Sequence, residues 1–424
     1  MYKAIVCKLD EVNDHPNADF IAIGVVRGHN VIIGKDQKKG DLGIFFSPEG
    51  QLSEEFCEFH DLCARHDPET GKKVGGGFFD KNRRVRAQSF RGVKSEGFWM
   101  PVQQLNDYYS TTFSEGYTFE GTADKYAAYN DKPLCKKYET PATIRARANK
   151  ARTDIEQHII GFLKHVDTAQ LRLEWDSIPD GSLLTITEKL HGTSHRVGHV
   201  IVKIDLSWWQ RAINKITSIL GYTIFKTERW QIVHGTRNTI VDKNSKGYYG
   251  SEAWRIDTIG DLDLNRGEVI YGELVGYTPN DKSIMNEQDT LPELRSEYPE
   301  KMVYSYGCTP EQAEFYVYRI TQDGKDLSDE DLLQRCDDLG LSAVPYINIL
   351  MLSDDNKQSV REYLNAVTAG SSMLCDDHIR EGIVVRVTTP DRITYFLKNK
   401  SYEFGRMEGY IKDKSEYVDR EEIA

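Results

Sequence analysis

The chain has 424 residues, 39% of them hydrophobic and 28% charged, which is the composition of a globular protein with roughly two or three domains. Its formal net charge of −12 argues against a protein that coats nucleic acid nonspecifically. Local basic surfaces remain compatible with that charge, because salt screens a charge within about 10 Å.

The sequence contains neither a membrane segment nor a secretion signal. No stretch approaches the roughly 18 apolar residues of a membrane span, and the start, MYKAIVCKLDEV, lacks the apolar run of a signal peptide. The cysteines follow no regular spacing, which favours reduced thiols. We therefore expect a cytoplasmic protein, or a phage protein acting in the host cytoplasm, with no membrane partner.

Residues 1–104 are predicted to form short β-strands. The stretches YKAIVCKL, IAIGVVRG, HNVIIG and DLGIFFS are rich in strand-forming residues, and HPNAD, KDQKKGD and SPEG supply the turns between them. Short strands at this spacing predict a small barrel or sandwich.

Positive charge is concentrated in two segments, residues 81–94 and 136–152. Their basic residues are Lys81, Arg83, Arg84, Arg86, Arg91 and Lys94 in the first, and Lys136, Lys137, Arg145, Arg147, Lys150 and Arg152 in the second. Each segment can be a nucleic-acid-binding surface or only a solvated face, and both interpretations stay open.

The middle of the chain changes character. Residues 105–160 are polar and aromatic and then helix-like (PATIRARANKARTDIEQHIIGFLKH), so we expect a linker followed by a helix. Strands and helices alternate over residues 161–412, which we expect to form a second domain. Residues 413–424 are predicted to be an acidic tail.

One insertion within this second domain, KIDLSWWQRAINKITSILGYTIFKTERW, has apolar residues at helical spacing. These residues are Trp208, Trp209, Ala212, Ile213, Ile216, Ile219 and Leu220. We expect them to pack into the core. The alternative is a helix that lies on a membrane surface or against a partner, because lysines and an arginine occupy the other face.

The stretch LTITEKLHGTS alternates like a β-strand and ends on Lys189, followed by a histidine, a glycine and two hydroxyl residues. Five later segments contain the residue types that nucleotidyl transfer needs. They are HGTRN with Arg237, VIYGELVGY with Glu273, EFYVYRI with Tyr316 and Tyr318, REGIVVR with Glu381, and YFLKNKSYEF with Lys398 and Lys400. Each segment alone has an ordinary structural explanation, so the argument depends on the ordered set.

The chemistry of this set is specific. A lysine amine attacks a nucleotide α-phosphate only when it is neutral, and neighbouring cations such as Lys398 and Lys400 favour the neutral form. The same cations neutralise the charge on the leaving pyrophosphate. Carboxylates are then needed to hold Mg²⁺, and Glu273 and Glu381 can supply them.

An adenine base also needs an aromatic platform. Tyr316 and Tyr318 are two residues apart, so they share one face of a strand, and Lys398 and Lys400 share a face for the same reason.

The ordered set resembles the covalent nucleotidyltransferase superfamily of polynucleotide ligases and mRNA capping enzymes. EKLHGTS is most similar to the lysine motif of phage RNA ligase 2 and the RNA-editing ligases. The resemblance implies an α+β fold, in which an ATP-grasp-like adenylyltransferase domain of antiparallel sheets has flanking helices. It also implies ATP and Mg²⁺ or Mn²⁺ as cofactors.

The resemblance assigns roles to individual residues. The implied catalytic residues are Lys189 as the adenylated nucleophile, Glu381, Lys398 and Lys400, and the implied metal ligands are Glu273 and Glu381. The implied nucleotide-binding residues are Glu188, Lys189, Thr193, Ser194, Arg237, Glu273, Tyr316, Tyr318, Val384, Lys398 and Lys400. Tyr318 would stack on the adenine, with Tyr316 as the alternative.

The order of the modules narrows the choice within the superfamily. VNDHPNADFIAIGVVRGHNVIIGKDQKKGDLGIFFSPEGQLSEEF and RVRAQSFRGVKSEGFWMP resemble the N-terminal OB-like β-barrel of one class of RNA ligases, the Deinococcus and Naegleria type. That class joins 3′-OH and 5′-phosphate ends at nicks in duplexes, so the implied partner is RNA or an RNA-containing duplex with a nick, bound by a monomer. One departure is His191, which stands where those ligases usually have an aspartate.

Two other functions remain open. The chain can be a noncatalytic RNA-binding protein whose transferase domain has degenerated, with His191 as a sign of that loss. It can also be another covalent nucleotidyltransferase, a DNA ligase or a capping guanylyltransferase. Self-labelling with ATP, and the sugar required at the break, distinguish these functions.

Overall fold

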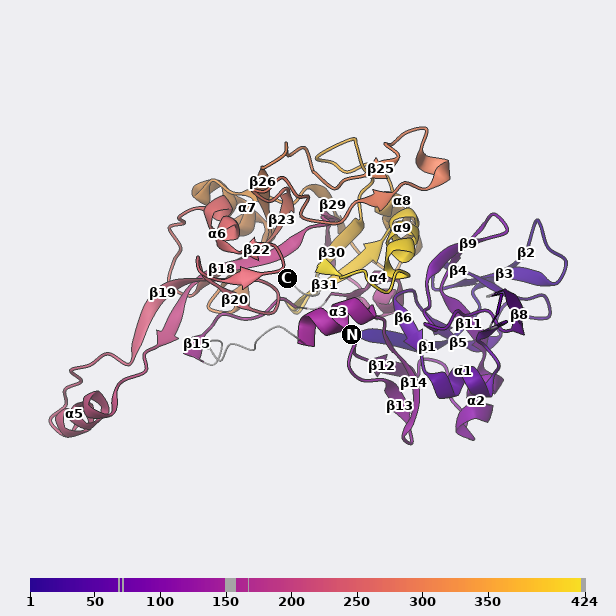
Figure 1. Ribbon diagram of the computed structural model, residues 1–424, viewed down its shortest axis with the longest axis horizontal. Helices are drawn as coiled ribbons and strands as arrows, with labels where there is room; N and C mark the ends of the chain where they lie inside the picture. Colours follow the sequence, from indigo (N-terminus) through magenta and orange to yellow (C-terminus); the bar gives the residue numbers. More distant parts are fainter. Residues whose placement is uncertain (68, 71, 149–157, 167, 421–424) are drawn as a thin grey trace. The chain divides into compact units, whose positions relative to one another are not determined.

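The computed structural model describes residues 1–424 except 68, 71, 149–157, 167 and 421–424. Two compact units divide the chain, and neither is one continuous stretch of it (Figure 1). Unit 1 comprises Met1–Pro141, Ala169–Ile178 and Asn399–Tyr417, and unit 2 comprises Ala142–Thr168, Pro179–Lys398 and Val418–Ala424. These divisions differ from the expected boundaries, because the end of the chain returns to unit 1.

Unit 1 consists mainly of short antiparallel sheets. The first sheet has the order β11 (Phe98–Pro101), β5 (Leu42–Phe46), β1 (Tyr2–Lys8), β12 (Thr118–Gly121). The second has the order β2 (Glu11–Asp14), β3 (Ile21–Val26), β4 (His29–Gly34). The third has the order β13 (Ala127–Tyr129), β14 (Lys132–Lys137), β6 (Gly50–Leu52). The pairs β7 (Ala64–His66) with β8 (Lys73–Gly76) and β9 (Ala87–Phe90) with β10 (Val93–Glu96) complete the strand pairings. These pairings form separate sheets and do not by themselves show a closed barrel.

The alternation of side chains along β1 explains why this strand lies between two cores. Ala4 and Val6 pack into one buried cluster, whereas Ile5 and Cys7 pack into another. Successive side chains of a strand point to opposite faces, so an almost continuously apolar strand is buried on both sides.

The segment expected to be a linker contributes β12, β13 and β14 to unit 1. The helices of this unit are α1 (Glu54–Phe59), α2 (Val102–Tyr109), the short α4 (Leu171–Glu174), which follows β16 (Ala169–Gln170), and the C-terminal α9 (Tyr402–Lys412). Helix α3 (Pro141–Ala148) begins where the chain passes to unit 2.

Unit 2 contains two mainly antiparallel sheets. The larger has eight strands, with the path β20 (Ile240–Val241), β19 (Glu228–Gly235), β18 (Thr193–Lys203), β23 (Glu268–Gly276), β26 (Ala313–Gln322), β27 (Lys325–Asp326), and with β15 (Ile159–Ile160) and β28 (Ser342–Ala343) beside β18 and β26. The other has the order β31 (Thr394–Lys400), β30 (Gly382–Thr388), β17 (Leu183–Lys189), β29 (Tyr346–Met351). Two small hairpin-like pairs are β21 (Lys246–Gly247) with β22 (Gly250–Ser251) and β24 (Gln288–Asp289) with β25 (Lys301–Met302).

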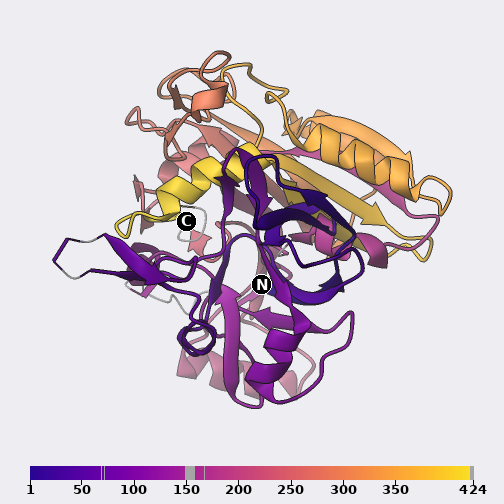
Figure 2. The same cartoon turned by 90° about the vertical axis from the view of Figure 1, so that its right-hand side faces the viewer.

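Helices cover these sheets. Helices α6 (Ala253–Ile259) and α7 (Asp329–Leu339) pack near β26, and α8 (Lys357–Thr368) lies along β30, as Figure 2 shows in orange. The fold is therefore α+β with mostly antiparallel sheets and flanking helices, as the sequence predicted. Among the described residues, no helix is long and apolar enough to cross a membrane.

The inserted helix α5 (Trp208–Ser218) corrects one prediction. It has no buried residue, and Trp208 is 82% exposed, so the expected core packing is wrong. The reason is the hairpin β18–β19, which stays paired out to Lys203 and Glu228 and presents α5 at its far end (Figure 1).

Candidate active site

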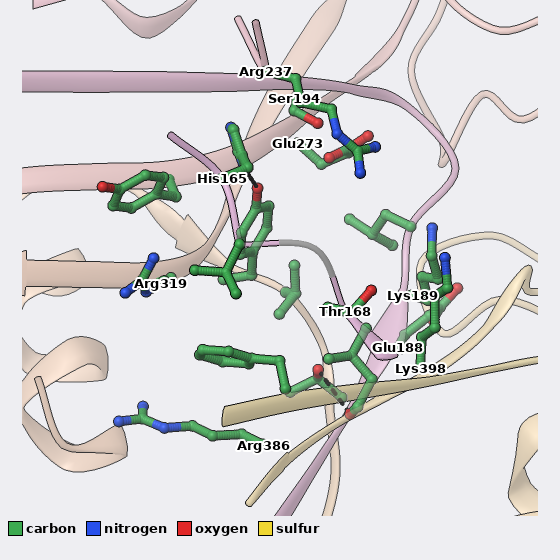
Figure 3. Close-up of a pocket in the computed structure, with 18 residues that line it drawn as sticks. His165, Thr168, Glu188, Lys189, Ser194, Arg237, Glu273, Arg319, Arg386 and Lys398 are labelled. Carbon is green, nitrogen blue, oxygen red and sulfur yellow. Dashed lines mark hydrogen bonds between the residues drawn. The ribbon is translucent and has the colours of Figure 1, made fainter. Parts of the chain in front are cut away.

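A cavity of about 140 Å³ lies between the two sheets of unit 2 (Figure 3). Strands β17, β30 and β31 provide one part of its wall, and β18, β23 and β26 provide another. Eight of the predicted nucleotide-binding residues line it: Glu188, Lys189, Ser194, Arg237, Glu273, Tyr318, Val384 and Lys398.

Strand register explains why Lys189 meets an acid. Lys189 at the end of β17 pairs with Gly382 at the start of β30, which brings the preceding residue, Glu381, next to the lysine. The Lys189 Nζ donates a hydrogen bond to Glu381 Oε2 at 2.8 Å. The Glu381 side chain is completely buried, whereas that of Lys189 retains 15% exposure towards the cavity.

His191 supports the same carboxylate. Its Nδ1 lies 3.4 Å from Glu381 Oε2, and its ring packs edge-on against Tyr304. Its backbone N–H donates to the buried Tyr306 hydroxyl at 2.6 Å, and burial raises the pKa of that phenol well above its usual value. The residue at the position of the expected aspartate therefore contacts Glu381 and does not add a second acid.

Gly192 is required because the turn after Lys189 passes close to β23. A Cβ atom at this position would lie 2.4 Å from the Leu274 carbonyl oxygen and 2.8 Å from Glu273 Cγ. No side chain fits at those distances, so glycine lets β18 begin directly beside β23.

The start of β18 separates the two hydroxyl residues. Ser194 pairs with Glu273 on β23, and both line the cavity. Thr193 points the other way, is fully buried, and accepts a hydrogen bond from Arg255 Nη2 at 3.1 Å. Thr193 therefore does not line the cavity as predicted, because neighbouring residues of a strand face opposite sides.

A β-bulge determines which tyrosine reaches the cavity. Tyr271 on β23 pairs with Arg319 and Gly272 pairs with Val317, which leaves Tyr318 as the extra residue of β26. The bulge places both Tyr318 and Arg319 in the cavity wall. Bulges often redirect side chains next to active sites in this way.

Tyr318 is held by a hydrogen bond between its hydroxyl and His165 Nδ1. Burial, together with the negative charge of Glu273, raises the pKa of Tyr318 well above its usual value, so the phenol stays neutral. Tyr316 pairs with Glu273 in the sheet but bonds to Glu314 and does not line the cavity.

Glu188 has a distinctive environment. It is only 1% exposed, and its Oε2 accepts a hydrogen bond from the Met373 N–H at 2.7 Å. Its Oε1 has no hydrogen-bond partner among the described residues. Burial raises the pKa of this carboxyl, and an unpartnered oxygen in the wall of a cavity is available to a ligand.

The two lysines of β31 differ. Lys398 lines the cavity, and Figure 3 shows it on the same side as Lys189. Lys400 belongs to unit 1 and does not line the cavity, because its Nζ bonds to Glu408 at 3.1 Å and to Glu49 at 2.9 Å. Of the two lysines predicted to reach one phosphate, only Lys398 is among the described residues of the cavity wall.

Several cavity residues were missed by the sequence analysis. They include His165, Arg319, Arg386 and Phe396. Phe396 and Arg386 lie within segments already singled out, and the spacing of two between Phe396 and Lys398 was a usable signal. His165 is far away in sequence and carried no signal at all.

No group of three or more His, Cys, Asp or Glu side chains in the described part of the chain could hold a metal ion by itself. Glu273 lines the cavity and Glu381 lies beside Lys189. Two carboxylates fit the usual mode of Mg²⁺ binding, in which one or two acids act together with phosphate oxygens of the substrate. The residues are thus compatible with a metal that arrives with a nucleotide.

Much of the basic segment 81–94 is neutralised within unit 1. Arg84 and Arg86 both pair with Asp413, and Lys94 pairs with Glu403 at 2.9 Å. Lys81 and Arg91 remain exposed. In the second basic segment, Lys150 and Arg152 lie outside the described residues.

The chain was compared with protein families, curated proteins and solved structures. The sequence model of the RNA ligase family matches residues 183–400, more than half of the chain. Solved structures of RNA ligase from Naegleria gruberi are similar in fold. A mutant without ligand has a TM-score of 0.57 and 17% identity, and the match covers 97% of this chain and 98% of that one. A mutant with ATP and Mn (16% identity) and the protein with PPi (18% identity) each have a TM-score of 0.55, and each match covers 98% of this chain and 99% of the other. The comparison with curated proteins found no match. On the family match, this chain belongs to the RNA ligase family.

Proposed function

We propose that this chain is an ATP-dependent RNA ligase that joins a 3′-OH end to a 5′-phosphate end, at nicks in duplexes, through lysyl-AMP and RNA-adenylate intermediates. The observation that carries the proposal is Lys189, whose amine lies in a cavity of nucleotide-binding residue types and bonds to the buried Glu381. The similar Naegleria structures contain ATP with Mn, AMP with Mn, or PPi; ATP is the reactant of such a first step and PPi is the product that it releases.

In the first step Lys189 Nζ attacks the α-phosphate of ATP. A P–N bond forms, the bond to the β-phosphate oxygen breaks, and pyrophosphate leaves. Glu381 orients the amine, which must have lost its proton when it attacks, and the nearby charge of Lys398 favours the neutral amine. A bound Mg²⁺ or Mn²⁺, held with the help of Glu273 and Glu381, would neutralise charge on the phosphates.

The adenine base would be bound by Tyr318, Val384 and Glu188. Tyr318 offers an aromatic face, and Val384, which pairs with Thr187 on β17, offers an apolar one. The unpartnered Oε1 of Glu188 can accept a hydrogen bond from the adenine amino group. Guanine presents a carbonyl oxygen at that position, so this contact favours ATP over GTP.

The later steps reuse the same groups. A 5′-phosphate oxygen attacks the lysyl-AMP phosphorus and releases Lys189, and the 3′-OH then attacks the activated 5′-phosphate and releases AMP. Arg237 and Lys398, both in the cavity wall, are positioned to bind phosphate. We propose that residues 1–104 act as an OB-like module that binds the RNA. Residues 161–412 would form the nucleotidyltransferase domain, and the enzyme would be a monomer.

The test is covalent labelling. Incubation with ATP labelled at the α-phosphate and Mg²⁺ or Mn²⁺ should tag the wild-type protein, and Lys189→Ala should abolish the tag. Lys325→Ala, which removes an exposed lysine outside the cavity, is the matched control and should label normally. A wild-type protein that binds RNA but is never tagged would favour the noncatalytic alternative.

Substrate choice is tested separately. Nicked duplexes with RNA or DNA at the 3′-OH side should be sealed preferentially when that side is RNA. Efficient sealing of an all-DNA nick would indicate a DNA ligase, and tagging by GTP instead of ATP would indicate a capping guanylyltransferase.

A further inference from the structure

The segment 203–230, here called the arm, extends past the rest of its sheet. Strand β18 pairs with β23 only over Thr193–Gly198, whereas its pairing with β19 continues to Lys203 and Glu228. Helix α5 lies at the end of this hairpin (Figure 1). None of the described residues that line the active-site cavity belongs to the arm.

The tip of the arm is an ordered structure. Asn214 and Phe225 are joined by a reciprocal pair of hydrogen bonds, 2.8 Å from the side-chain amide to the Phe225 carbonyl and 2.9 Å from the Phe225 N–H back to the side-chain oxygen. The ring of Phe225 packs edge-on against Trp209, and Ser207 with Gln210 forms a capping box at the start of α5. The exposure of apolar residues here is thus a property of a folded element.

The polar side of helix α5 contacts the segment that follows the helix, and most of its apolar side faces solvent. Asn214 and Gln210 make the contacts just described, whereas the apolar residues, 100° apart per position, form a continuous arc on the other side. The exposed fractions are 82% for Trp208, 65% for Ile216, 84% for Ile219 and 70% for Leu220, and Tyr222 and Ile224 extend the surface at 67% and 59%. Contiguous apolar surface of this kind usually marks a binding site.

The charge of the arm is opposite to that of the molecule. Its five basic residues are Lys203, Arg211, Lys215, Lys226 and Arg229. The arm also contains two acids, Asp205 and Glu228, so its net charge is +3. Because the whole chain has a net charge of −12, the residues outside the arm have a net charge of −15. All five cations are exposed, and none forms an ion pair within the described structure.

We propose that the arm docks on the surface of an anionic lipid bilayer. The apolar arc of α5 would enter the boundary between headgroups and acyl chains, and the flanking cations would contact the lipid phosphates. Lysine and arginine side chains can reach headgroups while their stems lie along apolar surface. The acidic remainder of the molecule is repelled by such a surface, so the arm approaches it first.

Two other occupants match the arm less well. RNA would satisfy the cations but would leave Ile216, Ile219 and Leu220 in water, because aliphatic side chains offer bases no stacking face. A second copy of the chain would bury the apolar arc, but a symmetric contact brings the same patch of each copy together and opposes two tips of charge +3.

The experiment is flotation of the full-length protein with vesicles. Vesicles of phosphatidylcholine with an equal share of phosphatidylglycerol should carry the protein upwards at low salt, and vesicles of phosphatidylcholine alone should carry much less. The double variant Trp208→Ser, Ile219→Ser should weaken binding to anionic vesicles about tenfold or more. Lys215→Gln with Lys226→Gln should weaken it and make it less dependent on salt.

Phe20→Ser is the matched control, because Phe20 lies in unit 1 and is 88% exposed. It should leave flotation unchanged, and all variants should keep the wild-type thermal midpoint. Wild-type protein that fails to float with anionic vesicles, or a Trp208, Ile219 double variant that floats as well as wild type, overturns the proposal. A wild-type dimer that the double variant converts to a monomer, or RNA affinity that falls in this variant without vesicle binding, assigns the arm to another occupant and also overturns it.

Discussion

At the scale of single residues, the site is defined by one lysine and its surroundings. Lys189 donates to Glu381, and Glu381 in turn has His191 at 3.4 Å. The carboxylate is completely buried, so its hydrogen bond to the amine is shielded from water and holds the lysine side chain in one position. The histidine in place of the expected aspartate thus lies against Glu381.

Glu381→Gln should slow self-labelling by about a hundredfold, because the amide keeps the size of the side chain but loses the charge that orients Lys189. The measurement is the initial rate of tagging by labelled ATP at saturating nucleotide. Glu330→Gln, which changes an exposed acid at the start of α7, should label at the wild-type rate. Equal rates in the two variants would show that Glu381 has no part in the first step.

At the scale of elements, two local features decide the geometry of the cavity. Gly192 allows β18 to start against β23, and the bulge in β26 brings Tyr318 and Arg319 to the same wall. Both features depend on how strands pair, which is why neither follows from the spacing of residues within one segment.

Gly192→Ala should lower the free energy of unfolding by about 1–3 kcal/mol, since its Cβ would overlap the Leu274 carbonyl. It should also reduce self-labelling about a hundredfold, because the turn that positions Lys189 must shift. Gly405→Ala is the control: its Cβ would meet Ala87 at an ordinary 3.7 Å. Urea unfolding and tagging rates check both effects, and a fully active, stable Gly192→Ala protein would contradict the explanation.

We expect the paired histidines of β18 and β19 to make unit 2 sensitive to acid. His195 Nε2 and His234 Nδ1 are 3.1 Å apart. Burial and the charge of Lys243 lower the pKa of His234 to about 4. Burial, together with nearby basic groups that include His234 and Arg255, lowers the pKa of His195 well below the usual value. Both rings are therefore neutral in the native state near neutral pH.

Because these pKa values are lower in the folded state, the unfolded chain binds more protons between about pH 6.5 and pH 4. The free energy of unfolding should fall as pH drops through that window, by about 2 kcal/mol from His234 alone at pH 4.5. Urea midpoints across this range measure the loss. His234→Gln should make the profile shallower, and an unchanged slope in this variant would exclude the histidine as the cause.

At the scale of the whole molecule, the chain forms units from separated segments. Helix α9, near the end of the sequence, belongs to unit 1, where Tyr402 donates to the Gln88 carbonyl and Arg84 donates to the Gly409 carbonyl. Phe404 and Met407 are almost completely buried there. The fold of unit 1 therefore includes residues from close to the end of the sequence.

A chain that ends at Lys398 should lose about 3–6 kcal/mol of the stability of unit 1, because two large apolar side chains of α9 are no longer buried. Limited proteolysis and urea unfolding should detect this loss in the N-terminal part of the chain. A chain that ends at Tyr417 keeps α9 and is the control. Equal protease resistance of the two truncated chains would show that unit 1 folds without the helix.

The sequence by itself predicted the residue types of the candidate site. Lys189, Glu381, Tyr318 and Lys398 were each predicted from residue type and order along the chain; Lys189, Tyr318 and Lys398 line the cavity, and Glu381 bonds to Lys189. Residue type and order suffice because the chemistry needs an amine, acids, an aromatic face and cations in strand-borne segments, and these patterns are local.

Only the tertiary structure decided which candidates meet. Thr193 turns into the core, Tyr316 stays outside the cavity and Lys400 pairs with acids of unit 1, because strand register and long-range pairing set the direction of each side chain. His165 enters the cavity wall from a distant segment. The helical pattern of α5 predicted a buried helix, yet periodicity gives only the existence of an apolar face, and whether another element covers that face depends on the fold.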